Sequence, residues 1–92
     1  MGAEFDFRTY RTFDKSQIRK AWTDDVQDSL RATGDSYSGC IGMLGGEIQW
    51  HTKKLHTQDE AVQYVMENHD KWEPPVAVQF IEGWVIGGWC SS

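Results

Sequence analysis

The chain has 92 residues, 39% of them hydrophobic and 13% aromatic, and a formal net charge of −5. This length predicts a single domain over residues 1–92 with enough apolar side chains for a core. The negative charge argues against nucleic acid as a partner, because affinity for phosphates comes from Lys and Arg. No basic patch is visible along the sequence, where Lys53-Lys54 is the only pair of adjacent lysines.

No segment resembles a signal peptide, and no apolar run approaches the ~20 residues needed to span a membrane. Met1-Gly2 is not a myristoylation signal, because Asp6 stands where Ser or Thr is required. Two cysteines are too few for a disulfide framework. We therefore expect a cytoplasmic protein with reduced thiols, no membrane partner and no cofactor.

The first half of the chain predicts a strand followed by a helix. Aromatic and charged residues alternate over residues 4–12, as in a half-buried strand. Asp14 and Gln17 form a capping pair that opens a helix, and Gly34 ends it. The helix presents one apolar side, made of Ile18, Ala21, Trp22, Val26 and Leu30.

Gly45-Gly46 lies between residues 37–44 and 47–54, which predicts a hairpin, because both glycines tolerate the positive φ of a tight turn. In the register that pairs Leu44 with Glu47, cross-strand neighbours share a face. One face then carries Ile41, Met43, Ile48 and Trp50, and the other carries Ser38, Cys40, Gln49 and His51.

Thr57 and Glu60 form a capping box that starts a second helix, with Pro74-Pro75 as its stop. Its inner side is predicted to carry Ala61, Val62, Val65, His69 and Trp72.

Two strands follow, over residues 76–81 and 84–90, joined at Glu82-Gly83. Pairing Ile81 with Trp84 divides their side chains between two faces. Phe80, Val85 and Trp89 fall on the face expected in the core, whereas Gln79, Trp84, Ile86 and Cys90 fall on the other.

The order β-α-β-β-α-β-β predicts an α+β fold. We expect a ferredoxin-like sandwich, in which both helices pack on one face of an antiparallel sheet. Right-handed crossovers favour this topology over its mirror image.

The run Ala21-Trp22, Val26, Gly34 and Tyr37-Ser38-Gly39-Cys40-Ile41 resembles the first half of small phage and prophage accessory proteins. Those proteins have an aromatic-rich first strand, an amphipathic helix and a Tyr-(Ser/Thr)-Gly-x-Ile strand. The resemblance covers roughly residues 5–50 and brings no catalytic residue with it. It implies an accessory protein encoded by a virus or mobile element. Neighbouring genes of a phage or a defence island would point toward interference with the host.

Cys40 and His51, as cross-strand neighbours, could form an activated thiol, or a half-buried cysteine beside a polar residue. A zinc site would need Cys90 with His56 or His69 as well, but no metal-ligand spacing is present. His69 reads more simply as a satisfied, partly buried histidine. The carboxylates are expected on the solvated surfaces of the helices. The alternative is that they mimic the phosphate backbone of a nucleic acid. We therefore expect neither a catalytic residue nor a metal.

The predicted functional surface is the sheet face opposite the helices, unless loops or the extra strand cover it. A mixture of aromatic, aliphatic and Arg side chains is typical of a protein-interaction surface. We expect the chain to bind a protein partner or a second copy of itself. The alternative is a small enzyme or ligand-binding protein with a pocket around Cys40, His51 and Trp84. The predicted partner-binding residues are Arg8, Tyr10, Gln49, His51, Gln79, Trp84 and Ile86.

Overall fold

The computed structural model describes residues 3–33, 44, 46–70 and 73–91, and these form a four-stranded mixed sheet with two helices. Strand β4 pairs antiparallel with both β1 and β3, whereas β2 runs parallel to β3, giving the order β1-β4-β3-β2. The elements in chain order are β1 (Ala3–Tyr10), α1 (Lys15–Thr33), β2 (Gln49–Lys54), α2 (Gln58–Asn68), β3 (Val76–Phe80) and β4 (Gly83–Ser91).

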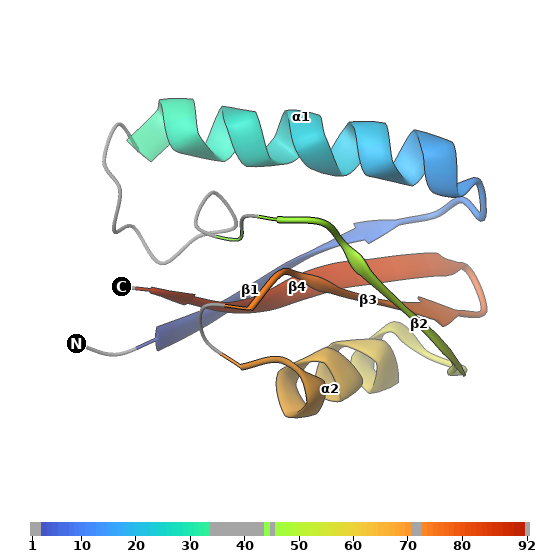
Figure 1. Cartoon of the computed structure of the whole chain (residues 1–92). Coiled ribbons are helices and arrows are strands. Elements are labelled where there is room, and N and C mark those ends of the chain that lie inside the picture. Colours follow the sequence, from blue (N-terminus) through green and yellow to red (C-terminus); the bar gives the residue numbers. More distant parts are fainter. Residues whose placement is uncertain (1–2, 34–43, 45, 71–72, 92) are drawn as a thin grey trace.

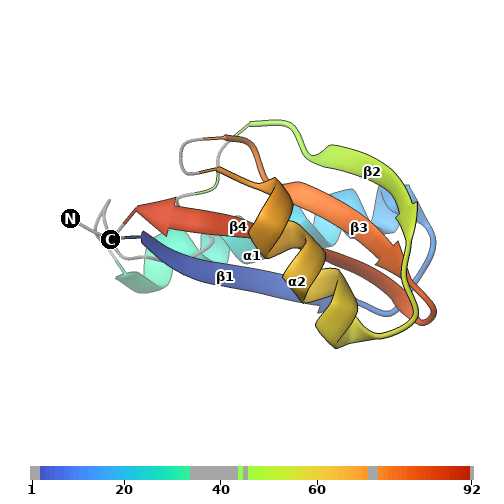
Figure 2. The ribbon, with the colours of Figure 1, turned by 90° about the horizontal axis from the view of Figure 1, so that it is seen from below.

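The two helices cover opposite faces of the sheet, so the molecule has three layers (Figure 1). Figure 2 shows α2 crossing the near face of the sheet, with α1 behind it. The core under α1 contains Ile18, Trp22, Leu44, Ala77, Trp84, Ile86 and Cys90. The core under α2 contains Ala61, Val65, Val76, Val78, Phe80 and Val85.

The α+β class is confirmed, but the prediction that both helices pack on one face is wrong, and the ferredoxin-like order is not found. The physical reason lies in the two central strands, which are apolar on both faces. Val76 and Val85 are fully buried toward α2, while Ala77 and Ile86 are fully buried toward α1. One layer of helices can cover only one of these faces.

The neighbour of β2 is the second correction. The predicted partner strand of the hairpin lies outside the described residues at 37–43, and Leu44 is buried without belonging to a strand. The strand that β2 contacts is β3, in parallel. A parallel pair needs a long crossover connection, and α2 supplies it.

Both helices begin where the sequence predicts. Asp14 caps α1, since its Oδ1 accepts hydrogen bonds from the backbone N–H groups of Ser16 (2.9 Å) and Gln17 (3.4 Å). Thr57 and Glu60 form the predicted capping box at the start of α2. Hydrogen bonds from the backbone N–H groups of His56 and Thr57 lower the pKa of Glu60 below its ordinary value.

The last hairpin turns at Ile81-Glu82, with Phe80 opposite Gly83. Its register therefore differs by two residues from the predicted one, which leaves every side chain on the predicted face. Val85 lies toward α2 and Trp84 toward α1. The Trp89 indole Nε1–H donates a 3.0 Å hydrogen bond to the Met66 carbonyl of α2, so Trp89 also lies on its predicted side.

His69 joins the end of α2 to β4. It is 3% exposed, and its Nδ1 accepts a 2.9 Å hydrogen bond from the backbone N–H of Trp89. Its Nε2 then carries the proton and donates to the Glu73 carbonyl at 3.0 Å. The imidazole lies so close to Gly88 that a Cβ there would be 2.6 Å from the ring. His69 is therefore satisfied and buried, as predicted, and Gly88 makes room for it.

Gly88→Ala is expected to lower the free energy of unfolding by about 1–3 kcal/mol, because the added methyl group would force the His69 ring away from β4. Denaturant unfolding measures the loss. In a His69→Ala background the ring is gone, so the same substitution should have a smaller effect. Equal losses in both backgrounds would contradict this packing argument.

The side chains of Asp6 and Arg8 form hydrogen bonds with the backbone of β1, at the edge of the described sheet. Asp6 Oδ1 accepts a 2.9 Å hydrogen bond from the Phe7 N–H, and Arg8 Nη1 donates a 2.8 Å hydrogen bond to the Phe7 carbonyl. Asp6 and Arg8 also pair with each other at 3.2 Å. A further strand needs free donors and acceptors along an edge, so these contacts disfavour edge-to-edge pairing at β1.

The double substitution Asp6→Ala/Arg8→Ala should increase self-association, because it frees the backbone groups of Phe7. Light scattering over a range of protein concentrations would detect this. Lys20→Ala/Asp24→Ala, on the exposed surface of α1, is the matched control, since it also removes one charge of each sign. Identical scattering from both double variants would show that Asp6 and Arg8 do not protect this edge.

Candidate functional site

A cavity of about 320 Å³ lies at the end of the molecule where α1 begins and β3 turns into β4. This end is at the right of Figure 1. The cavity is within the size range of small-molecule sites. It is lined by Phe13, Lys15, Trp50, His51, Thr52, Lys54, Gln79 and Trp84.

An irregularity in β2 accompanies this cavity. Trp50 pairs with Ala77 and Lys54 pairs with Gln79, so β2 uses four residue steps where β3 uses two. The intervening residues of β2 bulge out of register with β3. Bulges of this kind are frequent at sheet edges and beside binding sites, because they redirect side chains.

Two tryptophan rings form the inner wall of the cavity. The rings of Trp50 and Trp84 meet edge to face, with centroids 5.1 Å apart and planes at 86°. Lys15 Nζ lies 5.3 Å from the centroid of each ring, which is cation–π distance. Trp84 is 4% exposed, and its Nε1–H has no hydrogen-bond acceptor among the described residues.

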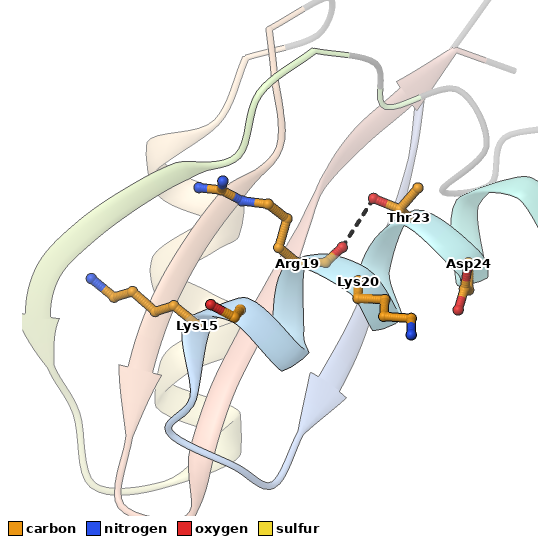
Figure 3. A pocket seen from close by; sticks show the side chains of 6 residues that line it. Lys15, Arg19, Lys20, Thr23 and Asp24 are labelled. Carbon is orange, nitrogen blue, oxygen red and sulfur yellow. Dashed lines mark hydrogen bonds between the residues drawn. The ribbon is translucent and has the colours of Figure 1, made fainter.

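The cavity and the nearby surface of α1 are positively charged. Lys15 and Lys54 line the cavity, and its described lining contains no Asp or Glu. A neighbouring hollow of about 410 Å³ on α1 is lined by Lys15, Arg19 and Lys20 with one carboxylate, Asp24. Figure 3 shows Lys15 and Arg19 extending toward β2, while Lys20 points away from it. The fold therefore assembles a local basic group that the sequence did not reveal.

Five of the seven predicted partner-binding residues belong to the α1 side of the sheet or its edge. Their predicted open face is wrong, because α1 covers it: Ile86 is fully buried and Trp84 nearly so. The half-buried Tyr10 donates a 2.6 Å hydrogen bond from its hydroxyl to Asp25 Oδ2 of α1. Gln79 lines the cavity, and Arg8 lies at the edge of β1.

The other two predicted residues, Gln49 and His51, contact other elements. Gln49 donates from its side-chain amide to the Pro74 carbonyl at 2.9 Å. His51 Nδ1 lies 2.7 Å from the hydroxyl of Tyr64, which belongs to α2. The seven residues therefore do not form one surface, although His51, Gln79 and Trp84 all line the cavity.

The thiol and metal hypotheses both involve Cys40. Cys40 lies outside the described residues, and Cys90 is a buried free cysteine. Within the described part of the chain, no three His, Cys, Asp or Glu side chains are grouped so that they could hold a metal ion.

The sequence does not predict five of the residues that line the cavity: Phe13, Lys15, Trp50, Thr52 and Lys54. The predicted hairpin gives Trp50 only a strand face, shared with Ile41, Met43 and Ile48. The available signal was positional: Lys15 is the first residue of its helix and Lys54 the last of its strand. Residues at the ends of elements often form sites, but only the topology shows which ends meet.

Comparison of the chain with protein-family models, curated proteins and solved structures finds no significant match. No helix among the described residues is long and apolar enough to cross a membrane.

The Tyr10–Asp25 hydrogen bond predicts a loss of stability at alkaline pH. Burial, and then the contact with Asp25, raises the pKa of Tyr10 far above its ordinary value near 10. The unfolded chain releases this proton above about pH 10 while the folded chain keeps it, so the free energy of unfolding should fall as pH rises beyond that point.

Tyr10→Phe should remove this part of the alkaline decline and lower stability at pH 7 by about 1–3 kcal/mol, since it leaves Asp25 without its donor. Denaturant unfolding at several pH values measures both effects. An unchanged alkaline decline in the variant would show that Tyr10 is not responsible.

Proposed function

We propose that the chain is a protein-interaction module that contacts its partner through the turn end. We define the turn end as loop residues 11–14, turn residues 81–82 and the mouth of the adjacent cavity. The turn end thus takes the place of the sheet face as the proposed binding surface, and the proposed function is still protein interaction.

The observation that supports the proposal is the position of two exposed apolar side chains. Phe13 is 54% exposed and Ile81 is 68% exposed, and both belong to the turn end. The other large hydrophobic side chains that the structure describes are at least partly buried. An ion pair between Arg11 and Glu82 ties the loop to the turn, so the two apolar groups are presented by connected segments. Exposed apolar groups gathered at one end are typical of an interaction surface.

The favoured partner is a different protein. A second copy could add a strand to the sheet, but at the β1 edge Asp6 and Arg8 already form hydrogen bonds with the backbone of Phe7. That the partner belongs to a host cell, and that the protein works in the cytoplasm, stay predictions from the sequence.

Replacing both Phe13 and Ile81 by Ser should weaken partner binding at least about tenfold, because a few apolar anchors carry most of the energy of an interface. The tagged chain would be recovered from its native cells, and the co-purifying protein identified, purified and titrated by calorimetry. Stability should change little, since both side chains are exposed.

The matched control is Lys20→Ser/Gln63→Ser, which changes exposed residues of the two helices. Equal affinity of the two double variants for the partner would overturn the proposal. A chain that recovers no protein, or that binds only a second copy of itself, would overturn it as well.

A further inference from the structure

The cavity beside the turn end has the charge of an anion-binding site. Lys15 and Lys54 both line it, and neither forms an ion pair with a described residue. Two ammonium groups at one cavity repel each other and attract an anion, even in a chain whose net charge is −5. The other polar side chains of the described lining, His51, Thr52 and Gln79, are hydrogen-bonding groups rather than carboxylates.

The wall of the cavity has the shape and chemistry of a ring-binding surface. Trp50 and Trp84 stand at 86° to each other, and Phe13 is exposed at the mouth. Aromatic side chains bind planar rings by stacking or by edge-to-face contact. The cation–π contacts of Lys15 hold its charge directly beside this wall.

Trp84 gives an independent indication that a polar partner is missing. Its indole N–H is buried without an acceptor among the described residues, although its ring lines the cavity. A buried donor without a partner destabilises a protein by about 1–3 kcal/mol, so such groups in native structures call for an explanation. An acceptor oxygen of a ligand would complete this hydrogen bond if the ligand reached the buried N–H from the cavity.

We propose that this cavity binds a small organic anion that carries a planar ring. The ammonium groups of Lys15 and Lys54 hold its phosphate or carboxylate group, and the ring lies against the wall formed by Trp50, Trp84 and Phe13. This site goes beyond the proposed protein-interaction function and does not depend on it.

The test follows the tryptophan indole N–H signals of the whole chain in proton–nitrogen correlation NMR spectra. The probes are phenyl phosphate, benzoate, inorganic phosphate and phenol, which separate the ring from the anion and phosphate from carboxylate. Phenyl phosphate or benzoate should shift the Trp50 and Trp84 signals saturably at millimolar concentration. The Trp89 signal should stay in place, because Trp89 bonds to Met66 on the opposite side of the sheet.

Lys15→Met/Lys54→Met should weaken binding of the ring-bearing anion at least tenfold, whereas Lys20→Met should leave it within about twofold. Methionine keeps most of the length of the side chain and removes the charge, and Lys20 lies on the same helix as Lys15 but does not line the cavity. The single variant Lys54→Met, on an exposed strand residue, keeps the test valid if the double variant fails to fold.

Three results would overturn the inference. One is the absence of saturable shifts of Trp50 and Trp84 with any ring-bearing anion. Another is equal binding by the Lys15→Met/Lys54→Met and Lys20→Met chains. The third is inorganic phosphate binding as tightly as phenyl phosphate and benzoate, which would leave no role for the ring. Each can occur whether or not the turn end binds a protein.

Discussion

Strand β4 carries apolar side chains on both faces, and its need for cover on two sides governs the rest of the structure. Val85 is buried under α2, while Trp84 and Ile86 are buried under α1. Burial of apolar surface stabilises a fold by roughly 25 cal/mol per Å², so either face left in water would be a large loss for a domain of this size. Trp84 also joins the core under α1 to β2, because its ring contacts the ring of Trp50. The aromatic wall of the cavity is thus a continuation of the core.

Much of the local structure could be predicted from the sequence, because local chemistry determines it. The caps at Asp14 and Thr57 are formed by side chains that bond to backbone only a few residues away. The faces of β3 and β4 follow from strand parity, which correctly separated Trp84 from Trp89. The layer that each helix joins could not be predicted. Periodicity shows that Ile18 and Trp22 need a partner surface, but both faces of the sheet offer one. The predicted exposure of Trp84 was wrong for this reason, because α1 covers its face of the sheet.

The composition of the cavity could not be predicted from the sequence either. Lys15 is the first residue of α1 and Lys54 is the last residue of β2, and the parallel placement of β2 beside β3 brings these two ends to one cavity. The net charge of the chain does not indicate this pair of lysines, because the net charge also counts carboxylates that lie elsewhere on the surface. Three of these carboxylates, Asp59, Glu60 and Glu67, line a different hollow, on α2. What a ligand experiences is the local field, which the total charge does not describe.

The pairing of β1 with β4 has a consequence for how the chain reaches this structure. Ala3 lies opposite Ser91, so the first strand finds its neighbour only at the far end of the described chain. During synthesis, β1 and α1 are made well before β4, the strand that both of them cover or contact. Closing so long a loop is entropically unfavourable and slows folding. The apolar side chains of the first strand and helix are therefore exposed to water, or bound by a chaperone, until residues 83–91 have left the ribosome.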